Sequence, residues 1–264
     1  MNQKTNWPTH RICLWSGPRN VSTALMYAFS QRSDTQVVDE PLYGHYLRVS
    51  EAKHPGYLEV LSKMNTDGSQ VVAEIILGPS KQPVLFMKQM AHHLVDINLD
   101  FLSETINVLL IRDPFDVLRS LINQIPNPVL HDTGLRIQVD LLNTFRKLGQ
   151  NLLVIDSIDL LTDPSTILSK LCQKIDISFQ DQMLSWPKGG RPEDGVWAPY
   201  WYNNVHQSMG FKPYIPKTEP FPPHLEKLLA ECKPLYKTLR LIKKKKFKSI
   251  AVEKIPNKGF GEVI

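Results

Sequence analysis

The chain has 264 residues, enough for one α/β domain with a substantial core, and its hydrophobic content of 42% is ordinary for a globular protein. No apolar run reaches the roughly 18 residues of a membrane-spanning helix, and the first residues lack the apolar stretch of a secretory signal peptide. Much of the net charge of +5 lies in a basic C-terminal tail, residues 243–264, which predicts a solvated tail and disfavours a nucleic-acid surface.

The cysteines are odd in number and widely spaced, at Cys13, Cys172 and Cys232. This pattern predicts buried free thiols in a reducing compartment, not disulfides. No cluster of His, Cys and Asp has the spacing of metal ligands, so no metal site is predicted. We therefore expect a cytoplasmic protein without a bound metal.

Short apolar runs alternate with helical patterns along the chain. Strands are predicted at residues 11–15, 36–39, 84–88, 107–112 and 152–156, and helices at residues 22–32, 57–64, 91–102, 114–124 and 134–148. Strands that alternate with helices form βαβ units. The sequence therefore predicts a single α/β domain, residues 1–264, with a central parallel sheet of about five strands flanked by helices.

A further helix is predicted at residues 162–175 and a last helix at residues 223–243. The segment between them, residues 185–215, is too rich in glycine, proline and aromatic residues to form regular structure. Long ordered loops of this kind usually have a function. We expect this segment to cover the substrate or the cofactor.

A phosphate-binding loop is predicted between the first strand and the first helix, over residues 16–23. Free backbone N–H groups and the helix dipole favour an anion at such a junction. Arg19 adds a positive charge, and Ser22 and Thr23 can donate hydrogen bonds. The loop lacks the Gly-x-x-x-x-Gly-Lys-Ser/Thr pattern of nucleotide triphosphatases and the Gly-x-Gly-x-x-Gly pattern of dinucleotide-binding folds.

A second anion-binding position is predicted where the strand at 107–112 ends. Arg112 closes this strand, Asp113-Pro114 opens the next helix, and Ser120 follows about two helical turns later. Ligands of open α/β sheets collect at this edge. An Arg and a hydroxyl that converge there suit a phosphate group.

The two loops together resemble the sulfotransferase family, which uses 3′-phosphoadenosine 5′-phosphosulfate (PAPS) as its donor. Its 5′-phosphosulfate loop corresponds residue for residue to Pro18-Arg19-Asn20-Val21-Ser22-Thr23, and its 3′-phosphate pair, eight positions apart, corresponds to Arg112 and Ser120. The resemblance implies a P-loop-like fold, PAPS as donor, 3′-phosphoadenosine 5′-phosphate (PAP) as product, and no metal. Two positions depart from the family pattern: Arg19 replaces a Lys, and Ala24 replaces a Trp that stacks on adenine.

The resemblance also suggests a catalytic base. Glu40, at the end of the second strand, resembles the base of heparan-type and bacterial members. His92 and His93 rank second, because the cytosolic Lys-x-His pattern has its His position at Met90 here. Lys88 matches the strand-end Lys of that pattern and is expected to neutralise charge on the transferred sulfonate.

The remaining predicted site residues lie near the strand ends and in the 185–215 segment. Lys188-Gly189-Gly190 loosely resembles a late family loop that also holds the 3′-phosphate. Tyr43 is expected to bind the substrate. Four further aromatic residues are expected either to line the acceptor pocket or to stack on adenine: Trp197, Tyr200, Trp201 and Tyr202.

Acidic residues around the acceptor, namely Asp39, Glu193 and Asp194, favour a cationic or amine-bearing small molecule. The loop variant is similar to that of a bacterial and plant small-molecule subgroup, and to cyanobacterial enzymes that sulfate alkaloids of the saxitoxin type. We therefore expect transfer to a hydroxyl or to an amine or guanidinium nitrogen. The sequence leaves the oligomeric state open.

Two other functions remain open from the sequence. One is a nucleotide-dependent phosphotransferase, such as a kinase, on a related P-loop fold, although the missing Gly-Lys-Ser/Thr counts against it. The other is a non-catalytic nucleotide-binding or nucleic-acid-binding module that uses the lysine-rich tail.

Overall fold

The computed structural model describes residues 10–244 of the chain, with side chains described up to residue 242. Its centre is one sheet of five parallel strands. They are β1 (His10–Ser16), β2 (Thr35–Asp39), β3 (Val84–Met90), β4 (Ile106–Ile111) and β5 (Leu153–Asp156). The predicted α/β class, the parallel sheet and the position of every strand are confirmed.

The strand order β2-β3-β1-β4-β5 decides where a ligand can bind. The chain adds β2 and β3 on one side of β1 and then crosses to add β4 and β5 on the other side. The connections that leave β1 and β4 therefore diverge beyond their carboxyl ends and leave a crevice there. The loop after Ser16 and the side chain of Arg112 both lie at this edge.

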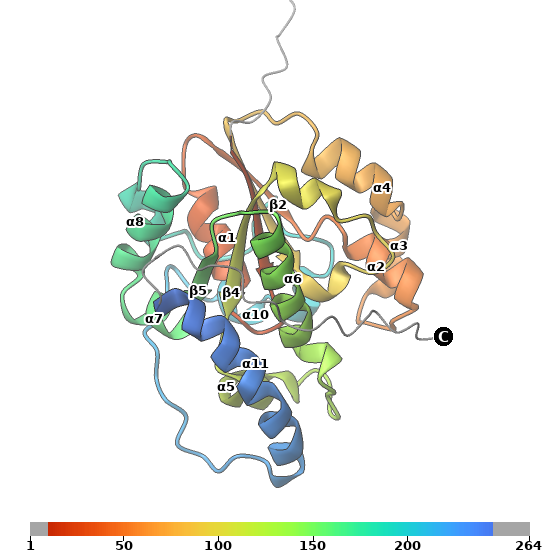
Figure 1. Cartoon of the computed structure of the whole chain (residues 1–264), viewed down its shortest axis with the longest axis vertical. Coiled ribbons are helices and arrows are strands. Elements are labelled where there is room, and N and C mark those ends of the chain that lie inside the picture. Colours follow the sequence, from red (N-terminus) through yellow and green to blue (C-terminus); the bar gives the residue numbers. More distant parts are fainter. Residues whose placement is uncertain (1–9, 245–264) are drawn as a thin grey trace, which may run out of the picture.

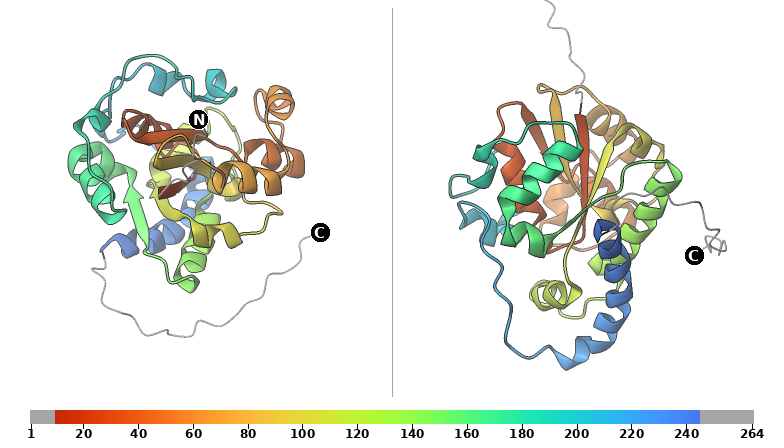
Figure 2. Two further views of the ribbon diagram at one scale, coloured as in Figure 1. Left: turned by 90° about the horizontal axis from the view of Figure 1, so that it is seen from above. Right: turned by 60° about the vertical axis from the view of Figure 1, so that its left-hand side comes forward.

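Helices cover both faces of the sheet (Figures 1 and 2). On one face, the apolar side chains of α1 (Ser22–Ser30) and α8 (Pro164–Lys174) pack against alternate strand residues such as Ile12 and Leu14. On the other face, α6 (Leu135–Lys147) and α11 (Glu226–Lys244) pack against Cys13 and Trp15. This alternation of burial along β1 is the pattern expected of a strand between two helical layers.

Several helices follow the sequence prediction, and others were missed. The predicted helices at 57–64 and 114–124 are α3 (Tyr57–Lys63) and α5 (Pro114–Leu121). Three helical segments were not predicted: α2 (Tyr43–Ser50), α4 (Gly68–Val71) with its continuation Val72–Ile76, and α7 (Ser157–Thr162). The 185–215 segment is not wholly irregular, since it contains α9 (Ala198–Trp201) and α10 (Asn203–His206).

The predicted helix at 91–102 is wrong. The chain forms two 3-10 turns there, Ala91–His93 and Asp100–Glu104, joined by irregular backbone. Asp96 has a left-handed φ of 44°, and the Asn98 side chain accepts a hydrogen bond from the backbone N–H of Asp100. Local side-chain bonds of this kind compete with helix formation, and the apolar residues of the segment still reach the core.

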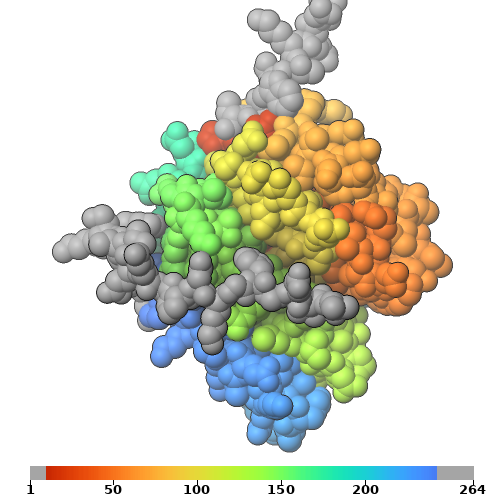
Figure 3. All heavy atoms as spheres, turned by 45° about the vertical axis from the view of Figure 1, so that its right-hand side comes forward, coloured from red at the N-terminus to blue at the C-terminus, as the bar shows by residue number. Residues whose placement is uncertain are grey.

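The space-filling view shows the C-terminal helix α11 (blue) beside the green segment that contains α5 and α6 (Figure 3). Of the basic tail at 243–264, only the helix backbone of its first two residues is described. Within residues 10–244, no helix is long and apolar enough to cross a membrane. All three cysteines are free and buried, as predicted.

Candidate active site

A cavity of about 550 Å³ opens at the carboxyl edge of the sheet. Its lining comes from the loop after β1, the ends of β2, β3 and β4, parts of α2 and α5, the loop after α2, and the segment from Trp197 to Lys217. One group of lining residues is basic and surrounds the predicted phosphate loop, and the other is rich in aromatic rings and histidines. The basic group is Arg19, Arg112, Lys212 and Lys217, and the aromatic group includes Tyr43, Tyr46, His54, His92, His93, Trp197 and Trp201.

The phosphate loop has an unusual backbone. Arg19 and Val21 both lie in the left-handed region, with φ of 63° and 60°. Such a conformation is a genuine outlier for a β-branched residue such as Val, and strain of this kind clusters at ligand-binding sites. Left-handed residues in a loop turn successive N–H groups toward one side, which creates a concave anion site. Gly17 is required here, since a Cβ on it would lie 2.2 Å from the carbonyl oxygen of Thr133.

Buried hydrogen bonds hold this loop against the neighbouring strand. The amide of Asn20 donates to the carbonyl of Leu110 over 3.1 Å, and the carbonyl of Asn20 lies 2.9 Å from the Ser157 hydroxyl. By contrast, the hydroxyls of Ser22 and Thr23 make no hydrogen bond to any residue that the structure describes. The loop backbone is therefore fixed while its two hydroxyls remain available to a ligand.

Arg19, Arg112 and Ser120 lie together, as the sequence predicts. Arg112 donates from Nη1 to the carbonyl of Arg19, and Arg19 donates from Nε to the Ser120 hydroxyl, each over 2.9 Å. Burial and the nearby charge of Arg112 lower the pKa of Arg19. The Nε atom of Arg112 is buried without a partner among the described residues. Two close cations and an unused buried donor favour binding of an anion.

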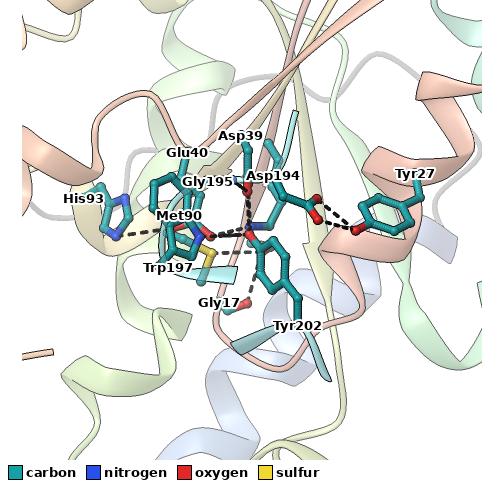
Figure 4. Close-up of polar contacts among 12 residues, drawn as sticks. Gly17, Tyr27, Asp39, Glu40, Met90, His93, Asp194, Gly195, Trp197 and Tyr202 are labelled. Carbon is teal, nitrogen blue, oxygen red and sulfur yellow. Dashed lines mark hydrogen bonds and ion pairs between the residues drawn. The ribbon is translucent and has the colours of Figure 1, made fainter. Parts of the chain in front are cut away.

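Glu40 belongs to a buried charge network at the ends of β2 and β3 (Figure 4). Asp39 and Lys88 are directly paired in the strand register, and both are almost fully buried. Lys88 donates to Asp39 over 2.9 Å, to Glu40, and to the Tyr202 hydroxyl over 2.6 Å. Burial raises the pKa of the Glu40 carboxyl, against the opposing charge of Lys88. A buried carboxyl with a raised pKa suits a general base.

His92 and His93 form part of the aromatic wall and not of a helix. The ring of His93 stacks on those of Tyr43 and Tyr46, with centroids 4.8 and 4.7 Å apart. Burial lowers the pKa of His92 to about 3 and holds that of His93 well below its usual value. His93 Nε2 lies 3.9 Å from Glu40 Oε2, beyond hydrogen-bond distance. Both imidazoles are therefore neutral at physiological pH.

The predicted aromatic and acidic residues divide into two sets. Tyr43, Trp197, Trp201 and Tyr202 line the cavity, whereas the exposed Tyr200 does not. Asp39, Glu193 and Asp194 also lie outside the lining, so they do not make the acceptor side acidic as predicted. Two of them are engaged by other side chains instead: Lys88 and Tyr202 donate to Asp39, and Tyr27 and His206 donate to Asp194.

The structure does not bring Lys188, Gly189 and Gly190 to the cavity. The N–H of Gly189 donates to the carbonyl of His206 instead. The segment 210–217 takes this place and contributes Gly210, Phe211, Lys212 and Lys217 to the lining. Sequence reasoning missed these residues, although Gly210-Phe211-Lys212 carries the same glycine and lysine signal as the stretch at 188–190.

Comparison with known proteins agrees with this geometry. A family model described as a sulfotransferase domain matches residues 10–242. Two Arabidopsis thaliana proteins, branched-chain-amino-acid aminotransferase-like proteins 2 and 1, are each 40% identical, over 87% and 86% of this chain. In both cases the match spans 41% of the relative's own length, so the chain corresponds to less than half of each.

Two solved structures share the fold at low sequence identity. The sulfotransferase domain of the Synechococcus PCC 7002 olefin synthase has a TM-score of 0.53 and 18% identity, covering 88% of this chain and 97% of that one. A sulfotransferase from Alicyclobacillus acidocaldarius has a TM-score of 0.51 and 11% identity, covering 90% and 97%.

Proposed function

The chain belongs to the sulfotransferase domain family, and from this premise we propose that it transfers a sulfuryl group from PAPS to a small-molecule acceptor. The observation that carries the proposal is the junction of the two anion-binding loops. Arg19, on the loop after β1, contacts both Arg112 and Ser120 at the end of β4 and on α5. A donor with a phosphate at each end of its ribose suits such a paired site.

The residues around this junction fit PAPS in number and kind. The N–H groups of the phosphate loop and the hydroxyls of Ser22 and Thr23 would hold the 5′-phosphosulfate. Arg112, through its unused Nε donor, and Ser120 would hold the 3′-phosphate. Lys217 would add a third positive charge at the second position: it lines the cavity, and burial together with the like charge of Arg112 lowers its pKa.

The adenine ring requires an apolar face, and Ala24 stands at the usual stacking position. We assign this role to Phe211, which lines the cavity and is held edge-on against Trp186 at a centroid distance of 5.1 Å. An aromatic ring gives a stacking surface that every purine can use. Phe211 would then supply the stacking surface that Ala24 lacks.

Glu40 would act as the base. Its Oε2 atom accepts no hydrogen bond from the described residues, so it is available to the acceptor. When the acceptor oxygen or nitrogen forms its bond to sulfur, its proton passes to Oε2, the bond from sulfur to the donor phosphate oxygen breaks, and PAP leaves. Arg19 and the loop N–H groups stabilise the charge that develops on the leaving phosphate.

The acceptor side suits a small, flat molecule. Tyr43, Tyr46, Trp197 and Trp201 supply aromatic walls, and the neighbouring histidines are neutral. Aromatic rings bind planar groups by stacking and bind cations through their faces. We therefore propose a planar hydroxyl compound, amine or guanidinium compound as acceptor, with Asp132 as a second carboxylate at the cavity, besides Glu40, that a cationic acceptor would meet.

A panel of flat phenols, amines and guanidinium compounds incubated with PAPS tests this proposal. We expect acceptor-dependent formation of PAP together with an equal amount of sulfated product, detected by mass spectrometry. PAP formation that proceeds at the same rate without any acceptor, and with no sulfated product, would argue against sulfuryl transfer to small molecules.

A further inference from the structure

We propose that Tyr202 is a positioning residue for the base: its hydroxyl holds Asp39 and Lys88 so that Glu40 keeps one carboxylate oxygen free for the acceptor. The inference rests on the proposed function and extends it to a residue outside both donor-binding loops. Tyr202 lies between α9 and α10, 114 positions after Lys88 in the sequence.

The hydrogen bonds of Lys88 leave no N–H unused. The ammonium has three donors, and the structure gives it three acceptors: Asp39 Oδ1, Glu40 Oε1 and the Tyr202 hydroxyl. Without the hydroxyl, one buried N–H would lose its partner. A buried charged donor does not remain unpaired, because the free-energy cost is high. The ammonium would therefore turn further toward the nearest carboxylate.

Asp39 and Glu40 are bound differently. Asp39 receives hydrogen bonds from Lys88, from the Tyr202 hydroxyl over 2.7 Å and from the N–H of Gly195 over 3.2 Å. Glu40 receives a bond from Lys88 at Oε1, while Oε2 faces His93 at 3.9 Å. The network therefore engages both carboxylate oxygens of Asp39 and leaves one oxygen of Glu40 free to exchange a proton with the acceptor.

Tyr202 donates to Asp39 in preference to Glu40. A phenol has a single proton, and the 2.7 Å contact places it on Asp39 Oδ2, whereas Glu40 Oε1 is 3.5 Å from the hydroxyl oxygen. Burial, with the charges of Asp39 and Glu40, raises the pKa of Tyr202 well above its usual value, so the hydroxyl keeps that proton. The indole N–H of Trp197 donates to the same oxygen over 3.0 Å.

Removing this hydroxyl should weaken the base without displacing it. With one acceptor fewer, Lys88 directs more of its charge to Glu40, which favours the ionised carboxylate and lowers its proton affinity. Loss of the 3.5 Å Tyr202 contact acts in the opposite direction, but this contact lowers the pKa of Glu40 less than the charge of Lys88 does. The titratable groups that face Glu40 are otherwise unchanged: Asp39 on β2, Lys88 on β3, and Tyr43 and His93 from α2 and the turn after β3.

The segment that carries Tyr202 also lines the acceptor cavity, so the base and the acceptor wall are built together. Trp197 contacts the ring of Tyr43 at a centroid distance of 5.0 Å while its indole N–H holds Tyr202. A second anchor lies on the same segment, where Asp194 accepts from Tyr27 of α1 and from His206. Anchors at both ends keep the hydroxyl in place.

The test compares Tyr202→Phe with Tyr200→Phe, which removes the same hydroxyl from an exposed ring of the same segment. The readouts are PAP affinity by calorimetry, kcat and KM against pH with an acceptor from the panel, and the titration of the Glu40 carboxyl by ¹³C NMR, assigned with Glu40→Gln. For Tyr202→Phe we expect kcat to fall about 10- to 100-fold, as for other residues that orient a catalytic group. The acidic limb of the profile and the Glu40 titration should both move to lower pH.

PAP affinity and the KM for PAPS should stay near wild-type values in both variants, and Tyr200→Phe should keep normal kcat. If Tyr202→Phe is fully active, or if its kcat falls while the Glu40 titration stays in place, the positioning role is wrong. If wild-type protein binds no PAP and transfers no sulfuryl group, the proposed function fails instead, whatever the NMR titration shows.

Discussion

Arg19 donates a hydrogen bond from Nε to the Ser120 hydroxyl over 2.9 Å, although the two residues are 101 positions apart. This contact joins the phosphate loop to α5, and Arg112 strengthens the junction by donating to the carbonyl of Arg19. The two guanidinium groups repel each other, which contributes to the lowered pKa of Arg19. A doubly anionic ligand between the loops would relieve that repulsion and use the free Nε of Arg112.

Arg112→Ala should weaken PAP binding by about 2–5 kcal/mol, because it leaves a buried phosphate without its main partner. Calorimetry with PAP and with AMP, which lacks the 3′-phosphate, separates this effect from general damage: AMP affinity should change much less. Arg146→Ala, on the exposed side of α6, is the matched control. An equal loss for PAP and AMP would mean that Arg112 does not bind the 3′-phosphate.

Glu40→Gln should lower turnover roughly 10²–10⁴-fold, because it keeps the shape of the side chain but removes the proton acceptor. PAP binding should hardly change, since a carboxylate adds nothing attractive to an anionic ligand. Glu104→Gln, at an exposed position, controls for the loss of a carboxylate elsewhere. Near-normal turnover in Glu40→Gln, together with inactive but folded His93→Gln, would transfer the role of base to the histidine.

Turnover should fall in acid as Glu40 takes up a proton, and the midpoint should lie above the usual carboxyl pKa of 4.5, because burial raises it. His92 and His93 stay neutral through this range, since burial lowers both of their pKa values. The acidic limb of kcat against pH should therefore persist in His92→Gln. If the acidic limb disappears in His92→Gln, Glu40 is not the group that titrates.

His92 should also make folding sensitive to acid. Burial lowers its pKa from 6.5 to about 3, so the unfolded chain binds a proton there before the folded chain does. Stability should therefore fall as the pH drops from about 6.5 toward about 3, by about 2 kcal/mol at pH 5 from this group. Urea unfolding near pH 7.5 and near pH 5 should show a smaller difference for His92→Gln than for wild type. The exposed His224→Gln should retain the full difference.

The sequence predicts the parts of the site that depend on local patterns. A strand, a loop and a helix follow one another at Ser16–Thr23 and again at Arg112–Ser120, so their place at the sheet edge follows from alternation alone. Parallel pairing then brings the two loops together. Glu40 and Lys88 also end neighbouring strands, and their proximity follows from the register of β2 and β3.

Long-range packing decides what the sequence leaves open. Two glycine- and lysine-bearing stretches, at 188–190 and 210–212, carry the same signal. The backbone N–H of Trp186 donates to the carbonyl of Met209, and the two stretches lie on opposite sides of this hydrogen bond. Only the later stretch lines the cavity. The role that we propose for Tyr202 could not be predicted from the sequence either, because its partners Asp39 and Lys88 are more than 100 positions away.

The central claim, a donor site built for PAPS, is tested most directly by the thermal stability of the protein with PAP or with ATP at equal concentrations. A ligand that binds the folded state raises its unfolding temperature by mass action. ATP lacks the 3′-phosphate that Arg112 and Ser120 are proposed to hold. We predict a clear rise with PAP and a much smaller rise with ATP. Equal stabilisation by both nucleotides would contradict the account.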